Sequence, residues 1–99
     1  MTQGIRGEPR RIVGRATGRV QGVGYRAFCI EVAMRLHVDG YAQNLTDGTT
    51  VAFEAEADES TLRSFVEKLR EGPAFSRVDD VEYRWEEVTG EFRGFEAVI

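Results

Sequence analysis

The stretch GRVQGVGYR, residues 18–26, contains three of the 11 glycines of this 99-residue chain within nine positions. Glycine has no Cβ, so a loop of this composition can turn several backbone N–H groups inward. An amphipathic helix pattern begins directly after it, and a helix start adds unpaired N–H groups and the positive end of the helix dipole. Together these features favour a cradle for an anion such as phosphate.

Arg26 falls in the first turn of the expected helix. A cation is unfavourable at this end of a helix unless an anion normally lies beside it. A glycine-rich turn followed by a solvated arginine explains the same residues, because isolated glycine patterns are weak signals. The loop alone therefore leaves both interpretations open.

The composition indicates one globular domain, with 41% hydrophobic and 30% charged residues. The single cysteine excludes an internal disulfide. No apolar run approaches the roughly 20 residues of a membrane span, and the N-terminal residues lack the apolar stretch of a signal peptide. We therefore expect a cytoplasmic protein that does not bind membranes, with residues 1–9 as a flexible tail and residues 10–99 as the domain.

Charge is distributed unevenly along the chain. Residues 1–26 carry six arginines and one glutamate, a net charge of +5, whereas residues 27–99 carry a net charge of −9. The basic segment can attract a small anion, but the acidic remainder would repel a long polyanion. We therefore expect no nucleic-acid partner, although an RNA-binding domain is a third interpretation that a salt-dependent RNA shift assay would separate.

Hydrophobic periodicity around the glycine-rich stretch predicts a strand over residues 10–17 and a helix over residues 25–36. Cys29 lies on the apolar stripe of that helix, which indicates a buried core thiol. The stripe, at helical spacing, consists of Tyr25, Phe28, Cys29, Val32, Ala33 and Leu36.

The rest of the chain reads as a hairpin, a helix and two strands. The hairpin covers residues 38–56, with strands at 38–44 and 50–56 joined by an Asp47-Gly48 turn. Asp58 is a candidate N-cap for a helix over residues 59–71. Alternating residues predict a strand over 77–88 and a short strand over 95–99.

The resulting order, β-α-β-β-α-β plus a terminal strand, predicts an α+β protein. Two helices with single apolar stripes can both cover one face of a mainly antiparallel sheet, which is the ferredoxin-like split β-α-β sandwich. This fold supports enzymes, RNA-binding modules and metal carriers, so it does not by itself define a function.

Asn44 is the second candidate site residue, because asparagine is disfavoured in strands and this one ends a strand before a turn. Its amide offers a donor and an acceptor, which can hold a water molecule in one orientation. A local backbone contact at the turn is the alternative. If the first and third strands are the parallel central pair, Arg26 and Asn44 can lie at the same edge of the sheet.

Two motifs in order resemble the acylphosphatase family. The first is the stretch at residues 18–26, and the second is GYAQNLTDG at residues 40–48, in which an asparagine precedes a turn closing on Asp-Gly. Gly72-Pro73 followed by SRV at residues 76–78 is similar to the family's link into its fourth strand. The resemblance spans roughly residues 10–99.

The resemblance implies hydrolysis of small acyl phosphates to a carboxylate and inorganic phosphate, with no metal or organic cofactor. Arg26 would clamp the phosphoryl group and Asn44 would orient the attacking water. The loop amides that would cradle the phosphoryl oxygens belong to Gln21, Gly22, Val23, Gly24, Tyr25 and Arg26. A non-catalytic phosphate- or anion-binding regulatory module on the same fold is the alternative, and a monomer is expected in either case.

The sequence departs from the family pattern at a few positions. His37-Val38 replaces a glycine and an aliphatic residue before the second motif, and Gly14 and Ala16 are smaller than the valines usual in the first strand. These differences concern packing and stability more than the candidate site.

Overall fold

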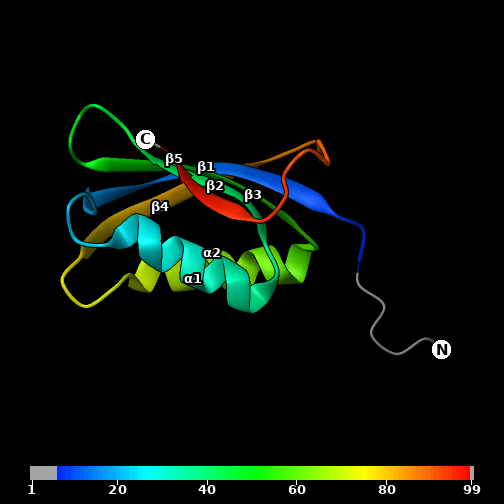
Figure 1. Cartoon of the computed structure of the whole chain (residues 1–99), viewed down its shortest axis with the longest axis horizontal. Helices are drawn as coiled ribbons and strands as arrows, with labels where there is room; N and C mark the ends of the chain where they lie inside the picture. Colours follow the sequence, from blue (N-terminus) through cyan, green and yellow to red (C-terminus); the bar gives the residue numbers. More distant parts are fainter. Residues whose placement is uncertain (1–6, 99) are drawn as a thin grey trace.

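The computed structural model describes residues 7–98, and both of its helices cover one face of a five-stranded sheet (Figure 1). The order confirms the predicted β-α-β-β-α-β arrangement with a terminal strand. Residues 1–6 of the expected tail and Ile99 lie outside the described residues. The elements are β1 (Arg10–Arg19), α1 (Tyr25–Leu36), β2 (Asp39–Asn44), β3 (Thr50–Ala57), α2 (Glu59–Glu71), β4 (Arg77–Glu86) and β5 (Phe95–Val98).

Both helices begin and end at the predicted residues. The Asp58 side chain caps α2 by accepting a hydrogen bond of 3.0 Å from the Thr61 backbone N–H, and Gly72 ends the helix with φ at 68°. Strand ends differ from prediction by one or two residues, because β1 continues through Arg19 beside β4 and β4 stops at Glu86. Neither helix in the described part of the chain is long and apolar enough to cross a membrane.

The sheet order is β4-β1-β3-β2-β5. The expectation that the first and third strands run parallel is wrong: β3 is antiparallel to both β1 and β2. The crossover through α1 makes β1 and β2 parallel, and the hairpin then inserts β3 between them. The loop after β1 and the end of β2 consequently lie at the same end of the sheet, as predicted, although for a different reason.

The core lies between the sheet and the helices. Phe53 and Phe65 pack edge to face at its centre, with ring centroids 6.1 Å apart, and both are buried. The small residues of the first strand fit this packing. A Cβ on Gly14 would lie 2.4 Å from the Glu82 carbonyl oxygen and 2.7 Å from both the Phe53 ring and the Tyr83 Cβ, so neighbouring atoms already occupy the space above the glycine.

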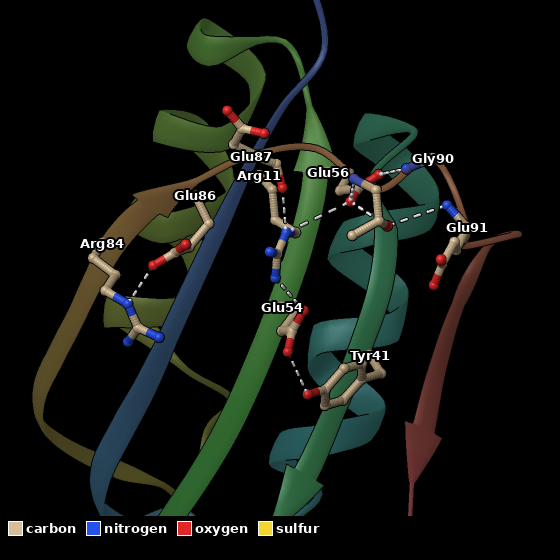
Figure 2. A network of polar contacts seen from close by, with 10 residues as sticks. Arg11, Tyr41, Glu54, Glu56, Arg84, Glu86, Glu87, Gly90 and Glu91 are labelled. Carbon is tan, nitrogen blue, oxygen red and sulfur yellow. Dashed lines mark hydrogen bonds and ion pairs between the residues drawn. The ribbon is translucent and has the colours of Figure 1, made fainter.

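A polar network ties the β4–β5 connection to the open face of the sheet (Figure 2). Glu56 is buried and accepts hydrogen bonds from the Thr89 backbone N–H at 2.8 Å and the Gly90 N–H at 3.1 Å. Arg11 donates from Nε to the Glu87 carbonyl at 2.7 Å. The network fixes the start of the segment that returns to form β5, an edge strand that runs parallel to β2.

We expect Glu56→Gln to lower the free energy of unfolding by about 1.5–3 kcal/mol, because a buried charge-assisted acceptor is lost and an amide N–H₂ then faces backbone donors. Glu86→Gln is the matched control: its partner Arg84 is exposed, and such a pair contributes at most about 1 kcal/mol. Urea denaturation of both variants measures the difference. Equal losses would show that Glu56 does not anchor the connection.

Candidate active site

The candidate site lies where β1 and β2 end and α1 begins, at one end of the sheet (Figure 1). Residues 20–24 form the loop between β1 and α1. Gly22 and Gly24 have φ values of 76° and 82°, a region that residues with a Cβ rarely adopt. The sequence of this loop therefore determines its shape, which brings backbone N–H groups to the start of the helix.

The first turn of α1 has neither a side-chain cap nor an acidic residue. Gly24 is the N-cap residue, and its carbonyl accepts the first helical hydrogen bond from Phe28 at 3.0 Å. No side chain of the helix therefore accepts hydrogen bonds from the first N–H groups or places a negative charge beside the positive end of the helix dipole. This arrangement suits an anionic ligand.

Arg26 projects from this first turn and is partly buried. Its Nη1 donates a hydrogen bond of 2.9 Å to the carbonyl of Val98 in β5. None of the ion pairs among residues 7–98 includes Arg26. A guanidinium has five N–H donors, so a carbonyl contact on one nitrogen leaves donors for a bidentate contact with an anion.

Asn44 ends β2, opposite Val51 of β3. Its Oδ1 is buried and has no hydrogen-bond partner within the described residues. Leaving a buried acceptor unpaired costs about 1–3 kcal/mol, so such an atom requires an explanation. A donor from outside the described residues, such as a water molecule, would satisfy it.

Arg26 and Asn44 line one cavity of about 270 Å³. Of the predicted loop residues, Gly22, Gly24 and Tyr25 line it as well, but Gln21 and Val23 do not. The complete lining is Val20, Gly22, Gly24, Tyr25, Arg26, Ala27, Ile30, Asn44 and Ala97.

The hydroxyl of Tyr25 is engaged in a contact between the two helices. It donates a hydrogen bond of 2.7 Å to the Leu69 carbonyl of α2, and burial raises its pKa well above the usual range. Burial also raises the pKa of the Cys29 thiol to about 12, as expected for a core cysteine. Neither group is suited to act as a nucleophile or a base near neutral pH.

A family model described as Acylphosphatase matches residues 12–97. This chain belongs to the acylphosphatase family. It is 43% identical over 89 residues to an acylphosphatase of Salinibacter ruber, covering 90% of this chain and 93% of that one. An acylphosphatase of Thermus thermophilus is 46% identical over 85 residues, covering 86% of this chain and 94% of that one.

Solved acylphosphatase structures share the fold. The crystal structure of acylphosphatase from Bacillus subtilis superposes with a TM-score of 0.86 at 33% identity, covering 91% of this chain and 99% of that one. An acylphosphatase structure from Coxiella burnetii gives a TM-score of 0.82 at 28% identity and covers 99% of this chain. Motifs, family match and fold thus agree that this is an acylphosphatase hydrolase.

The sequence did not predict several features of the acylphosphatase site, including Val20 and Ala27 of the lining. Arg26 contacts β5 through Val98, and Ala97 of the same strand lines the cavity. No sequence signal placed β5 beside β2. Ile30 also lines the cavity, and its spacing of four residues from Arg26 on a helix is a signal that could have found it.

The Gln21 side chain fastens the glycine-rich loop to the β2–β3 turn. Its Nε2 donates to the Leu45 carbonyl at 2.7 Å and to the Thr50 carbonyl at 2.9 Å. The predicted role of Gln21 concerned its backbone N–H, whereas its side chain positions the loop relative to the strand end that carries Asn44.

We expect Gln21→Ala to lower kcat by about 10- to 100-fold while the protein remains folded, because displacements of about 1 Å in a positioned site have effects of this size. Thr46→Ala, at an exposed position of the same turn, is the control and should keep normal kcat. Steady-state kinetics with an acyl phosphate measures both. A Gln21→Ala variant with unchanged kcat would argue against this positioning role.

Proposed function

We propose that this chain hydrolyses acyl phosphates by attack of an Asn44-oriented water molecule on a phosphoryl group held by the loop and Arg26. The observation that carries the proposal is that Asn44, whose buried Oδ1 has no hydrogen-bond partner among residues 7–98, lines the same cavity as Arg26. A water molecule that donates to this oxygen satisfies it and keeps its own oxygen lone pairs for attack on phosphorus.

The phosphoryl group binds at the N-terminus of α1. Backbone N–H groups of residues 21–26 donate to its oxygens, and Arg26 forms a bidentate contact with two of them. These donors are fixed before the substrate arrives, since glycine conformations shape the loop and Gln21 anchors it. Preorganised donors of this kind stabilise charge that develops in the transition state.

In the reaction, the water oxygen forms a bond to phosphorus while the bond between phosphorus and the bridging oxygen breaks. The acyl group leaves as a carboxylate with the electron pair of that bond. Phosphoryl transfer through a loose transition state depends mostly on positioning and charge stabilisation. The carboxylate is also a good leaving group, so the step needs little acid assistance.

The proton of the attacking water goes to a phosphoryl oxygen of the substrate. Among the described residues that line the cavity, only Tyr25 and Arg26 have titratable side chains. The Tyr25 hydroxyl donates to Leu69, and the Arg26 guanidinium offers donors but no acceptor for a proton. His37, the only histidine, caps the opposite end of α1.

We further infer a monomeric cytoplasmic enzyme that binds no nucleic acid. The net charge of −4, with −9 over residues 27–99, supports the absence of a polyanionic partner. Size-exclusion chromatography with light scattering tests the monomeric state, and an RNA shift assay at low salt tests the absence of nucleic-acid binding.

Release of inorganic phosphate from benzoyl phosphate, with a chelator present, tests the proposed function. Phenyl phosphate is the matched control, because it offers the same phosphoryl group with a poorer leaving group. We expect turnover of benzoyl phosphate alone. A folded protein that binds phosphate but releases none would instead be an anion-binding module.

A further inference from the structure

The cavity is lined by both polar and apolar residues. The proposed function uses Gly22, Gly24, Arg26 and Asn44 of this lining for the phosphoryl group and the attacking water. The remaining lining includes two residues of α1, Ala27 and Ile30, and one residue of β5, Ala97. The proposed function gives no role to these three apolar side chains, which together are called the apolar wall of the cavity.

We propose that Ala27, Ile30 and Ala97 form the subsite for the acyl group and make this chain select compact hydrocarbon acyl groups over polar ones. This inference rests on the proposed function, since it assigns the part of the substrate that lies beyond the phosphoryl group. In an acyl phosphate, the acyl carbon is separated from phosphorus by one oxygen, so the acyl group must lie directly beside the phosphate site.

The position of Ile30 supports this assignment. Ile30 lies one helical turn after Arg26, and residues at this spacing are neighbours on the helix surface. Its side chain is partly exposed and belongs neither to the buried core nor to the apolar side chains packed against the core, within the described part of the chain. Ile30 is therefore an apolar side chain that lies outside the core and borders the cavity.

Ala97 provides the other side of the wall. It lies on β5, in register with Ala42 of β2, and β5 also packs against α1. Its methyl side chain is exposed toward the cavity. The wall thus combines one medium-sized side chain with two small ones, which leaves room for an acyl group.

The size and chemistry of the cavity limit the acyl group. About 270 Å³ lies just below the range of roughly 300–1,000 Å³ that holds drug-sized ligands, so a phosphoryl group and a compact acyl group together suit it. Alanine and isoleucine side chains offer no hydrogen bond. An amide-bearing acyl group would lose water there without a replacement partner, which is unfavourable.

The test compares kcat/KM of the purified protein for acetyl, propionyl, butyryl, benzoyl and carbamoyl phosphate. We expect kcat/KM to rise about fourfold with each added methylene from acetyl to butyryl, because burial of each methylene contributes to binding in the transition state. Carbamoyl phosphate, nearly the same size as acetyl phosphate, should be the poorer substrate of the two.

Variants of the wall make the test specific. Ile30→Ala should lower kcat/KM for butyryl and benzoyl phosphate about tenfold more than for acetyl phosphate, and Ile30→Leu should restore most of the selectivity. Ala97→Leu should narrow the site and affect benzoyl phosphate most. Met34→Ala, an exposed apolar position further along α1, is the control with unchanged selectivity.

The outcomes separate the two proposals. If every acyl phosphate is hydrolysed but the substrate ratios do not change in Ile30→Ala and Ala97→Leu, the acyl subsite is wrong and the proposed function stands. If the folded wild-type protein releases no phosphate from any of these substrates, the proposed function itself fails. Inhibition by inorganic phosphate, which has no acyl group, should be the same in the wild type and the wall variants.

Discussion

Arg26→Ala is expected to abolish phosphate binding and to lower kcat/KM by about 10³-fold or more, the range that transition-state arginines supply in phosphoryl transfer. Arg26 extends from the first turn of α1 into the cavity, and its Nη1 contact with the Val98 carbonyl holds the guanidinium in place. Without it, the loop amides alone face the negative charge of the phosphoryl group.

Arg26→Lys should also lose most of the activity, because an ammonium is a point charge and does not reproduce the planar fork of a guanidinium. Arg19→Ala is the matched control: it removes the same charge from an exposed position at the end of β1. Phosphate titration by calorimetry and steady-state kinetics measure both effects. A lysine variant with near-normal turnover would show that bidentate contact is not required.

Asn44→Ala is expected to lower kcat by about 10²-fold or more, since the attacking water would lose its orientation. Phosphate should still bind, because the loop and Arg26 are unchanged. The variant should also be at least as stable as the wild type, as it removes a buried Oδ1 that lacks a partner in the described chain.

This combination of lower kcat and unimpaired stability distinguishes a catalytic asparagine from a structural one. Urea denaturation, phosphate titration and kcat should therefore be measured on the same preparation. A folded Asn44→Ala protein with undiminished kcat would remove Asn44 from the mechanism, and a large loss of stability would instead assign it a structural role.

The sequence predicted the elements accurately where local signals were strong. Asp58 marked the start of α2, and the apolar stripe of α1 predicted its buried face, including Cys29. These signals are local, because caps and periodicity depend on residues within a few positions of one another. The strand ends were predicted less accurately, because pairing with a distant strand decides where a strand stops.

Non-local features could not be predicted in the same way. The sequence suggested that Arg26 and Asn44 meet, but the reason given, parallel first and third strands, was wrong. The position of β5 depends on the network around Glu56 that holds the preceding connection, and this network joins residues far apart in the sequence (Figure 2). Ala97 and the Val98 carbonyl enter the site only through that placement.

The most direct test of the central claim is hydrolysis of benzoyl phosphate in ¹⁸O-labelled water, with both products analysed by mass spectrometry. If an oriented water molecule attacks phosphorus, inorganic phosphate gains one ¹⁸O atom per turnover and benzoate gains none. Recovery of the label in benzoate would mean that water attacks the carbonyl carbon, and would contradict the roles proposed for Arg26 and Asn44.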